Sequence, residues 1–232
     1  LDERIVILDI DEKSLAEIGH WPWSRNHLAQ LVDRLFDEQQ VAALGVDIVF
    51  AEPDDRSGLG QLKALAQGEL RDDARFVARL PELSRRLDHD QRFAEALRDR
   101  PVVLGYYFTA DRGALRSGRL PAPVLTDAGL QAQGQVPFQA TVWDGFGSNI
   151  AQLAEAAPQA GFFNPVTDSD GVVRALPLLA RHEGAYYESL ALALLRAVSG
   201  ATEVLPVTAP GSGGQGQSPV LSSVGLTLGS SS

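Results

Sequence analysis

Five carboxylate side chains beside two apolar runs are the first candidates for chemistry: Asp9, Asp11, Asp47, Glu52 and Asp54. Asp9 and Asp47 end runs that we expect to be strands, and an open parallel sheet binds ligands at the carboxyl ends of its strands. Carboxylates gathered there could hold Mg²⁺ or Ca²⁺, because hard cations prefer oxygen ligands. The alternative, which we favour, is that Asp9 and Asp11 cap turns and Asp47 pairs with Arg25, because acids often accept hydrogen bonds from backbone N–H groups there.

A second cluster lies in the segment GHWPWSR, where Trp21 and Trp23 flank Pro22 and Arg25 follows. Tryptophan rings at a rigid corner could stack on a ligand, and the planar fork of Arg25 could hold an anion. The structural alternative, which we favour, is that both rings plug one end of the sheet, since large aromatic side chains dominate cores. Arg25 could equally bridge to Asp47 or Asp54.

Other sites of chemistry are excluded by residue type or spacing. The chain has no cysteine, and none of its four histidines has a second histidine or an acid at metal-ligand spacing. The motif DSDG (168–171) begins like a calcium loop, but the closing carboxylate position holds Leu179, so we expect a hairpin turn. GSGGQG (211–216) opens no helix and is interpreted as a linker. We therefore expect no catalytic residue, no metal and no cofactor.

The net charge of −10 makes nucleic acids and anionic lipid surfaces unfavourable partners. No apolar run is long enough to cross a membrane. Methionine is absent, also from position 1, and we expect the chain to be a piece of a longer protein.

The elements that must position these side chains follow from hydrophobic spacing. Residues 4–9 form a β-branched run that predicts a buried strand, and 41–51 predict a second strand that is apolar on both faces. Between them, 24–40 carry the stripe of an amphipathic helix, with Ser24 as its N-cap. Strand, helix and strand in this order predict a right-handed βαβ unit and a parallel sheet.

The rest of the chain continues this alternation. Helices are predicted over 70–86, 89–99 with Asp88 as N-cap, 149–157, and 187–198 ended by Gly200; strands are predicted at 101–108 and as a β-hairpin over 161–181. Residues 109–148 are expected to be a long irregular excursion. Residues 201–232 are rich in Ser, Gly and Pro and are expected to be flexible, although 224–229 could still form a short strand. The predicted fold is α/β, a mostly parallel or mixed central sheet flanked by helices, in one domain over residues 1–200.

Three segments together resemble one family, the CHASE type 2 domain: RIVILDIDEKSLAEIGHWPWSR (4–25), VAALGVDIVFAEPD (41–54) and GFFNPVTDSDGVVRALPLLARHEGAYYESLALALLRAVSG (161–200). The resemblance spans about residues 4–200 and is loose over 55–160. It implies a sensory domain outside the cytoplasmic membrane of a bacterial inner-membrane protein, tethered by membrane helices. The implied cytoplasmic outputs are adenylate or diguanylate cyclases and histidine or serine/threonine kinases. Family members continue into a final strand, so we expect this chain to be truncated at its end.

The hypothesis from the sequence is a periplasmic signal-input domain that binds an unknown small ligand or ion and is no enzyme itself. Seven residues are predicted to bind the ligand: Asp9, Asp11, Trp21, Trp23, Arg25, Asp47 and Asp54. The first alternative is a ligand-free module that forms a homodimer in the same receptor, since two-fold contacts are the commonest. The second is a metal-dependent hydrolase built on the acidic cluster, although no motif positions a nucleophile or base.

Overall fold

The computed structural model describes residues 2–110, 113, 115–167, 170–209 and 218–228. Its central sheet places the parallel strands β1 (Leu44–Val46) and β7 (Ala160–Phe162) on either side of β2 (Val102–Thr109), because both pair with Leu104. Further along β2, β6 (Gly145–Gly147) pairs antiparallel and carries β3 (Arg116–Ser117) on its other edge. The predicted α/β fold with a mixed sheet is confirmed.

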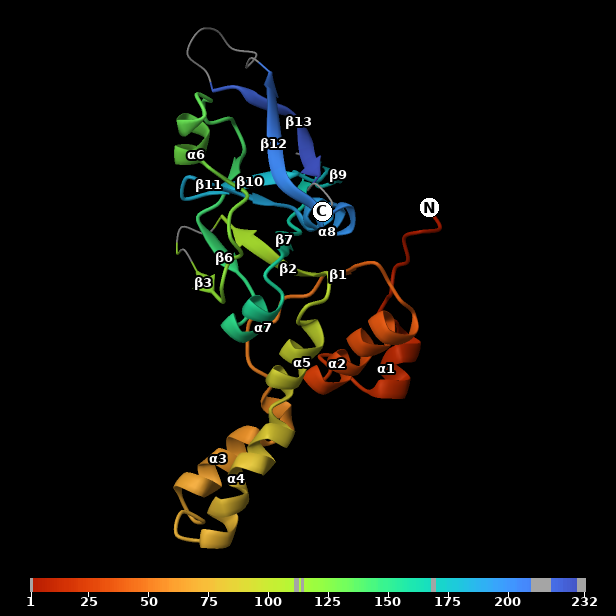
Figure 1. Ribbon diagram of the computed structural model, residues 1–232, viewed down its shortest axis with the longest axis vertical. Helices are drawn as coiled ribbons and strands as arrows, with labels where there is room; N and C mark the ends of the chain where they lie inside the picture. Colours follow the sequence, from red (N-terminus) through yellow and green to blue (C-terminus); the bar gives the residue numbers. More distant parts are fainter. Residues whose placement is uncertain (1, 111–112, 114, 168–169, 210–217, 229–232) are drawn as a thin grey trace.

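Helices cover this sheet and bury its apolar side chains (Figure 1). Helix α8 (Leu190–Ser199) packs on the three parallel strands. Helix α2 (Arg25–Asp33) packs on α5 (His89–Leu97), which packs on α7 (Ala151–Ala156). The largest fully buried side chains of the main core are aromatic: Phe50, Phe93, Tyr106, Phe108 and Phe162.

Three of the predicted helix ends are confirmed by their caps, whereas the helix predicted from 187 begins only at Leu190, because Tyr187 belongs to strand β11 (Ala185–Glu188). The Ser24 hydroxyl accepts a hydrogen bond from the Asn26 N–H, and the Asp88 carboxylate accepts one from the Gln91 N–H. Gly200 adopts the left-handed conformation that ends α8. Helix α2 continues into a π-helical turn at Arg34–Glu38, so the predicted stretch 24–40 holds two consecutive helical segments.

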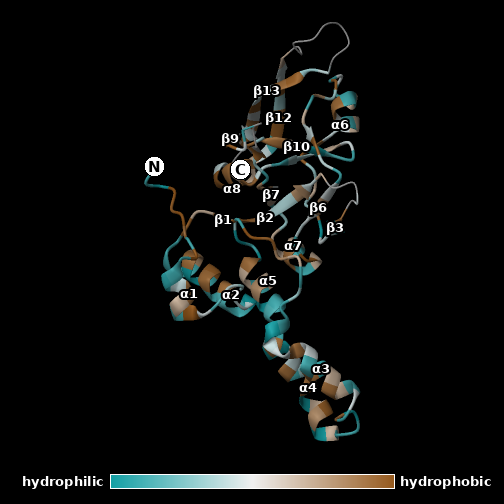
Figure 2. Ribbon diagram, turned by 180° about the vertical axis from the view of Figure 1, so that it is seen from behind, coloured by the Kyte–Doolittle hydropathy of each residue, from teal (hydrophilic) through white to brown (hydrophobic). Residues whose placement is uncertain are grey.

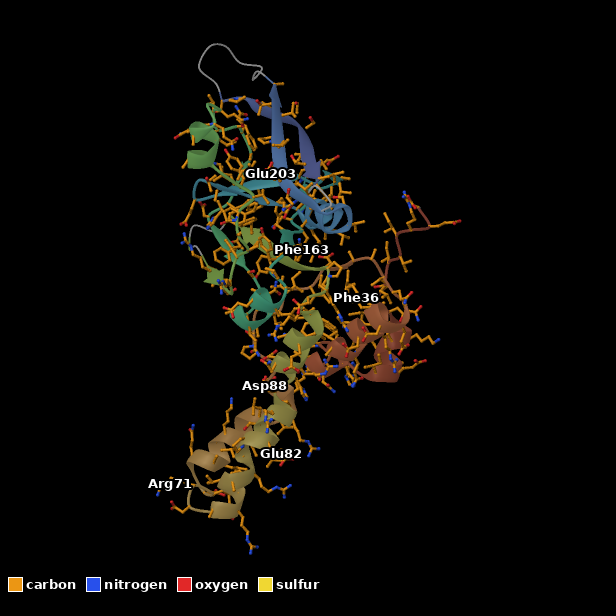
Figure 3. All side chains as sticks on the ribbon, in the orientation of Figure 1. Phe36, Arg71, Glu82, Asp88, Phe163 and Glu203 are labelled. Atoms are coloured by element: carbon orange, nitrogen blue, oxygen red, sulfur yellow. The ribbon has the colours of Figure 1, made fainter. Side chains whose placement is uncertain are left out.

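A helical hairpin projects from the body at one end (Figure 1). It consists of α3 (Leu59–Gln67) and α4 (Ala74–Leu87), neither of which has a buried residue. Charged side chains such as Arg71 and Glu82 extend from it (Figure 3). The predicted helix at 70–86 is confirmed as α4, whereas α3 lies in a stretch for which no helix was predicted.

A second sheet lies beside the first and has the strand order β4 (Leu125–Thr126), β11 (Ala185–Glu188), β10 (Leu179–His182), β5 (Thr141–Val142). Helix α6 (Asp127–Ala132) follows β4. The interval 109–148 is therefore less irregular than expected. Its elements are too short to leave a periodic pattern in the sequence.

The hairpin predicted over 161–181 was only partly correct. Its first segment is β7, which pairs with β2 in the central sheet. The hairpin instead joins β8 (Val166–Thr167) to β9 (Val173–Ala175), and part of the predicted DSDG turn lies outside the described residues. A second hairpin joins β10 to β11.

The predicted strand at residues 4–9 was wrong. Arg4 lies in a turn, residues 5–9 pair with no strand in the described part of the chain, and Ile5, Val6, Ile7 and Leu8 are 59–81% exposed. The predicted strand 41–51 shrinks to β1, so the two-strand βαβ unit is not formed. An apolar run becomes a buried strand only where it pairs with a neighbouring strand of a sheet.

The expected flexibility of residues 201–232 was also wrong for most of that segment. Strands β12 (Ala201–Ala209) and β13 (Val220–Leu228) form an antiparallel hairpin, and 210–217 lie outside the described residues. Val204 is buried and Val224 and Leu226 are half-buried against a second core cluster. Apolar side chains from both strands hold this hairpin to the body, and the average composition concealed them. Within the described residues, no helix is long and apolar enough to cross a membrane.

Candidate ligand-binding site

A cavity of about 380 Å³ lies between the turn that carries Trp21, Pro22 and Trp23, which we call the tryptophan corner, and the chain that follows β1. We call it the corner cavity. Its lining comes from two segments: Trp21, Pro22, Trp23 and Arg25 on one side, and residues 48–56 on the other. Four of the seven predicted ligand residues therefore meet there: Trp21, Trp23, Arg25 and Asp54.

The tryptophan corner is built by the turn that follows α1 (Glu12–Ile18). Gly19 has a φ of 112°, a conformation that glycine adopts most readily, and its carbonyl accepts a 2.7 Å hydrogen bond from the Trp23 indole N–H. Trp23 is buried, and Trp21 contacts its ring edge-on with 5.8 Å between centroids. Trp21 is 37% exposed, so its ring is the one available to a ligand. The structural interpretation fits Trp23, and the binding interpretation fits Trp21.

Arg25 is buried and is held from several sides. Its guanidinium donates to the Glu52 carbonyl at 3.2 Å, lies 3.5 Å from the Asp90 carboxylate and stacks over the Phe50 ring at 4.3 Å. Burial lowers the pKa of Arg25, and the nearby Asp90 and Asp54 carboxylates oppose that shift. Because its guanidinium already contacts these groups, Arg25 holds the cavity wall in place and does not offer a free site for an anion.

Asp54 ties the two sides of the corner cavity together. Its carboxylate accepts hydrogen bonds from the backbone N–H groups of Arg25 at 2.7 Å and Arg56 at 3.0 Å, and His89 lies 3.4 Å away. The Asp54 N–H in turn donates to the Asp90 carboxylate at 2.9 Å. The Arg56 guanidinium donates to the Pro22 carbonyl. These bonds fix residues 52–56 against the start of α2.

The two carboxylates of this network have pKa values shifted in opposite directions. Burial raises the pKa of Asp90, and this outweighs the lowering by the Asp54 N–H and Arg25. Burial would also raise the pKa of Asp54, but the N–H donors of Arg25 and Arg56, with His89, lower it overall. Each shift makes the free energy of unfolding depend on pH.

We predict opposite pH profiles for Asp54→Asn and Asp90→Asn. Because the folded pKa of Asp54 is depressed, its stabilisation is present above the ordinary value of 3.8 and is lost as the pH falls through the folded pKa. The folded pKa of Asp90 is raised, so its contribution declines as the pH rises from 3.8 through that folded value. Urea unfolding across this range should show the stability advantage of the native chain over Asp54→Asn growing with pH, and that over Asp90→Asn shrinking. Parallel profiles would contradict the prediction.

Three predicted ligand residues lie outside the corner cavity. Asp9 is exposed in the extended N-terminal segment, and Asp47 is exposed after β1. Asp11 caps α1, because its carboxylate accepts hydrogen bonds from the backbone N–H and hydroxyl of Ser14. The cap expected for Asp11 is confirmed. The pairing of Asp47 with Arg25 was wrong, since Arg25 pairs with Asp90.

The acidic cluster does not assemble as a cation site. Among the residues that the structure describes, no group of three or more His, Asp or Glu side chains is placed to hold a metal ion. Asp9 and Asp47 do not end adjacent strands, so the sheet edge that was to gather the carboxylates is not formed.

Two residues that shape the site were missed. Asp90 follows the N-cap of α5 and gives no local signal of its pairing with Arg25. Asn149 is 1% exposed; its side-chain oxygen accepts from the Phe50 N–H at 2.8 Å, and its amide donates to the Gly105 carbonyl at 3.0 Å. Asn149 thereby fixes the cavity wall at Phe50 to strand β2.

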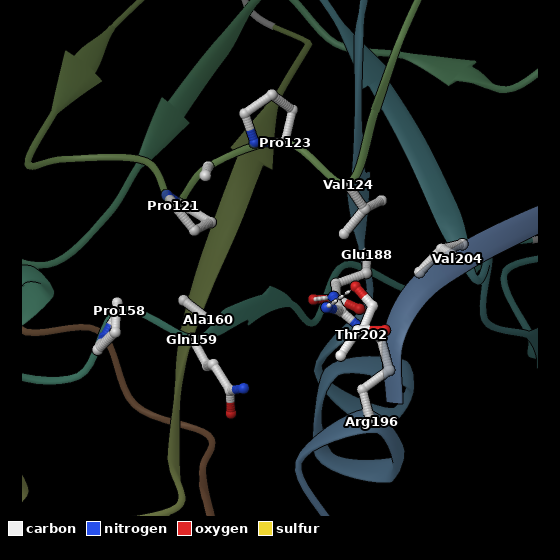
Figure 4. A pocket seen from close by; sticks show the side chains of 11 residues that line it. Pro121, Pro123, Val124, Pro158, Gln159, Ala160, Glu188, Arg196, Thr202 and Val204 are labelled. Carbon is white, nitrogen blue, oxygen red and sulfur yellow. Dashed lines mark hydrogen bonds and ion pairs between the residues drawn. The ribbon is translucent and has the colours of Figure 1, made fainter. Parts of the chain in front are cut away.

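A second cavity, of about 240 Å³, lies between the loop at 121–124 and the junction of β11, α8 and β12 (Figure 4). Its charged groups pair with each other, because Arg196 donates to the Glu188 carboxylate at 2.6 Å, although Glu188 Oε2 and Arg196 Nε are buried without a hydrogen-bond partner among the described residues. Burial raises the pKa of Glu188, and Arg196 opposes this. None of the seven predicted ligand residues lines this cavity.

Comparison with known proteins identifies one family. The profile of the CHASE2 domain matches residues 1–228, which is nearly the whole chain. The match extends the resemblance through 55–160 and over the β12–β13 hairpin. No curated protein and no solved structure matches the chain.

Proposed function

The chain belongs to the CHASE2 domain family, and we propose that it is the signal-input domain of a bacterial membrane-bound receptor, on the outer side of the cytoplasmic membrane. CHASE2 domains are sensory extracellular domains of signalling receptors and are not catalytic. In this proposal a ligand changes the conformational equilibrium of the domain, and the change reaches the membrane helices. The family membership is the observation that carries it.

The output of the proposed receptor is a cytoplasmic nucleotide cyclase or sensor kinase, as the resemblance implies. The sequence of the full-length protein tests this step. Membrane-spanning segments followed by a cyclase or kinase domain would support it. A parent protein without membrane-spanning segments would contradict it.

The ligand in this proposal occupies the corner cavity. The exposed ring of Trp21 offers an aromatic face, and the lining carries the carboxylates of Glu52 and Asp55 against two guanidinium groups, of Arg25 and Arg56. The Asp54 carboxylate is buried and already accepts from the backbone N–H groups of both arginines, so it is not available to a ligand. Both guanidinium groups already donate to backbone carbonyls. Aromatic faces beside carboxylates favour cations. We therefore propose a small organic cation, an amine or a quaternary ammonium compound.

Thermal denaturation with added compounds tests this assignment. Amines and quaternary ammonium compounds should raise the melting temperature, whereas matched anions should not, because a ligand that binds only the folded state stabilises it. Trp21→Ala should weaken binding by about 0.5–2 kcal/mol, the usual size of a cation–aromatic contact. Val136→Ala is the matched control, since Val136 is also an exposed apolar side chain and lies outside the cavity. Equal shifts in Trp21→Ala and the native chain would exclude the corner cavity.

A further inference from the structure

The N-terminal segment exposes an unusual amount of apolar surface. Ile5, Val6, Ile7 and Leu8 are 66%, 81%, 77% and 59% exposed, in a chain stretch that leads away from the body (Figures 1 and 2). Burial of such surface stabilises a fold by roughly 25 cal/mol for each Å². Contiguous apolar exposure of this kind marks a surface that is covered in some state of the protein.

Strand β1 has an open edge that could receive this segment. Leu44, Gly45 and Val46 pair with β2 on one side, and no strand within the described residues pairs with the other side. An open edge leaves backbone N–H and C=O groups available to a further strand.

Helix α8 continues the apolar surface next to β1. A Cβ atom built on Gly45 would lie 3.2 Å from a methyl carbon of Leu194, so α8 covers the face of β1 to which Gly45 belongs. Leu195 and Val198 follow Leu194 around the helix and are 55% and 58% exposed. This exposed stripe is the surface that a strand beside β1 would share.

The alternation of side chains matches the segment to this surface. Ile10 packs against the main core, as do Leu44 and Val46 of β1. Because side chains of a strand alternate between faces, Val6 and Leu8 would share the face of Ile10, whereas Ile5 and Ile7 would face α8. A strand formed by this segment would therefore place apolar side chains on both faces of the sheet, as β1 does.

We propose that residues 4–9 dock as a parallel strand on the open edge of β1, by a movement about Ile10, and cover the exposed stripe of α8. The occupant is the chain's own segment, because Ile10 is already anchored in the core and the helices between it and β1 form the crossover that parallel strands require. If the proposed function holds, docking would also reposition a membrane helix that precedes this segment.

Engineered disulfides test the docking without any ligand, so the result is independent of the proposed function. The chain has no cysteine. Ile7→Cys is combined in turn with Leu195→Cys and Val198→Cys, and with Ala78→Cys on the projecting helix α4 as the control. A disulfide within one chain requires Cα atoms about 4.4–6.8 Å apart. Under mild oxidation, intact-mass analysis and non-reducing electrophoresis should show an intrachain disulfide for at least one α8 position and none for the control.

Two outcomes would overturn the proposal. Disulfides formed only between chains would mean that the segment covers a second copy. Intrachain disulfides no more frequent than in the control would mean that it does not dock.

Hydrogen exchange provides a second readout that needs no cysteine. Ile7→Asp should speed exchange at the backbone amides of β1, and Val136→Asp, at an exposed apolar side chain elsewhere, should not. Identical exchange of β1 in the native chain and Ile7→Asp would also overturn the proposal.

Discussion

Replacement of Arg25 by methionine is expected to lower the free energy of unfolding by about 3–5 kcal/mol, the usual cost of removing one partner of a buried ion pair. The Arg25 guanidinium contacts the Glu52 carbonyl, the Asp90 carboxylate and the face of Phe50, and the residue is 9% exposed. Methionine keeps the apolar length of the side chain but leaves the Asp90 carboxylate without its guanidinium. The loss should therefore come from the polar network and not from packing.

Chemical denaturation of Arg25→Met and the native chain measures this loss. Arg4→Met is the matched control, because Arg4 forms an ion pair with Asp2 in which the arginine side chain is 88% exposed. An exposed pair of this kind contributes little to stability, because water screens it. Equal losses for the two variants would mean that the Arg25 network does not hold the corner cavity together.

Asn149→Ala is expected to destabilise the fold by roughly 1–3 kcal/mol for each of the two buried backbone groups that it leaves without a partner. These groups are the Phe50 N–H and the Gly105 carbonyl, which the Asn149 side chain joins. Since Phe50 lines the corner cavity, the same substitution should also weaken ligand binding there.

Asn26→Ala is the control for this prediction. The backbone N–H of Asn26 bonds the Ser24 cap, and alanine keeps that N–H. Its substitution should therefore cost much less than that of Asn149. If the two variants unfold at the same denaturant concentration, the bridge between residue 50 and strand β2 contributes nothing to stability.

The parts of the fold that could be predicted from the sequence are those whose signals are local. Helices α2, α5 and α8 carry an apolar stripe and a side-chain cap at the N-terminal end, and α8 also ends at a left-handed glycine. Strand β2 is a continuous apolar run, as expected for a strand buried on both faces. Residues 4–9 also contain a continuous apolar run. Whether such a run forms a strand depends on a partner strand elsewhere in the fold, which the run itself does not reveal.

The tail shows the opposite error. Strand β12 buries Ala201 and Val204, and apolar side chains alternate in β13 only over 224–228, yet glycine, serine and proline dominate the average composition of that segment. Pairing of the two strands with each other stabilises them, and composition does not report pairing.

The candidate site was predictable where its residues are close in sequence. Trp21, Trp23 and Arg25 share one short turn, so they had to lie together. Asp54 meets them because residues 48–56 pass beside that turn. Asp90 and Asn149 reach the site from distant elements, and only the tertiary structure brings them there. Asp9 and Asp47 lie outside the corner cavity. The strand that was to end at Asp9 is not formed, so the two carboxylates do not meet at one sheet edge.

The indole N–H resonances of the tryptophans test most directly whether the corner cavity is the ligand site. The chain has three tryptophans: Trp21 and Trp23 line the corner cavity, and Trp143 packs against Phe108 elsewhere. Titration of the isotope-labelled domain with the amine or quaternary ammonium compound that most raises its melting temperature should shift the signals of Trp21 and Trp23 and leave that of Trp143 unchanged. A saturable shift at Trp143 alone, or stabilisation without any shift at Trp21, would contradict a ligand in this cavity.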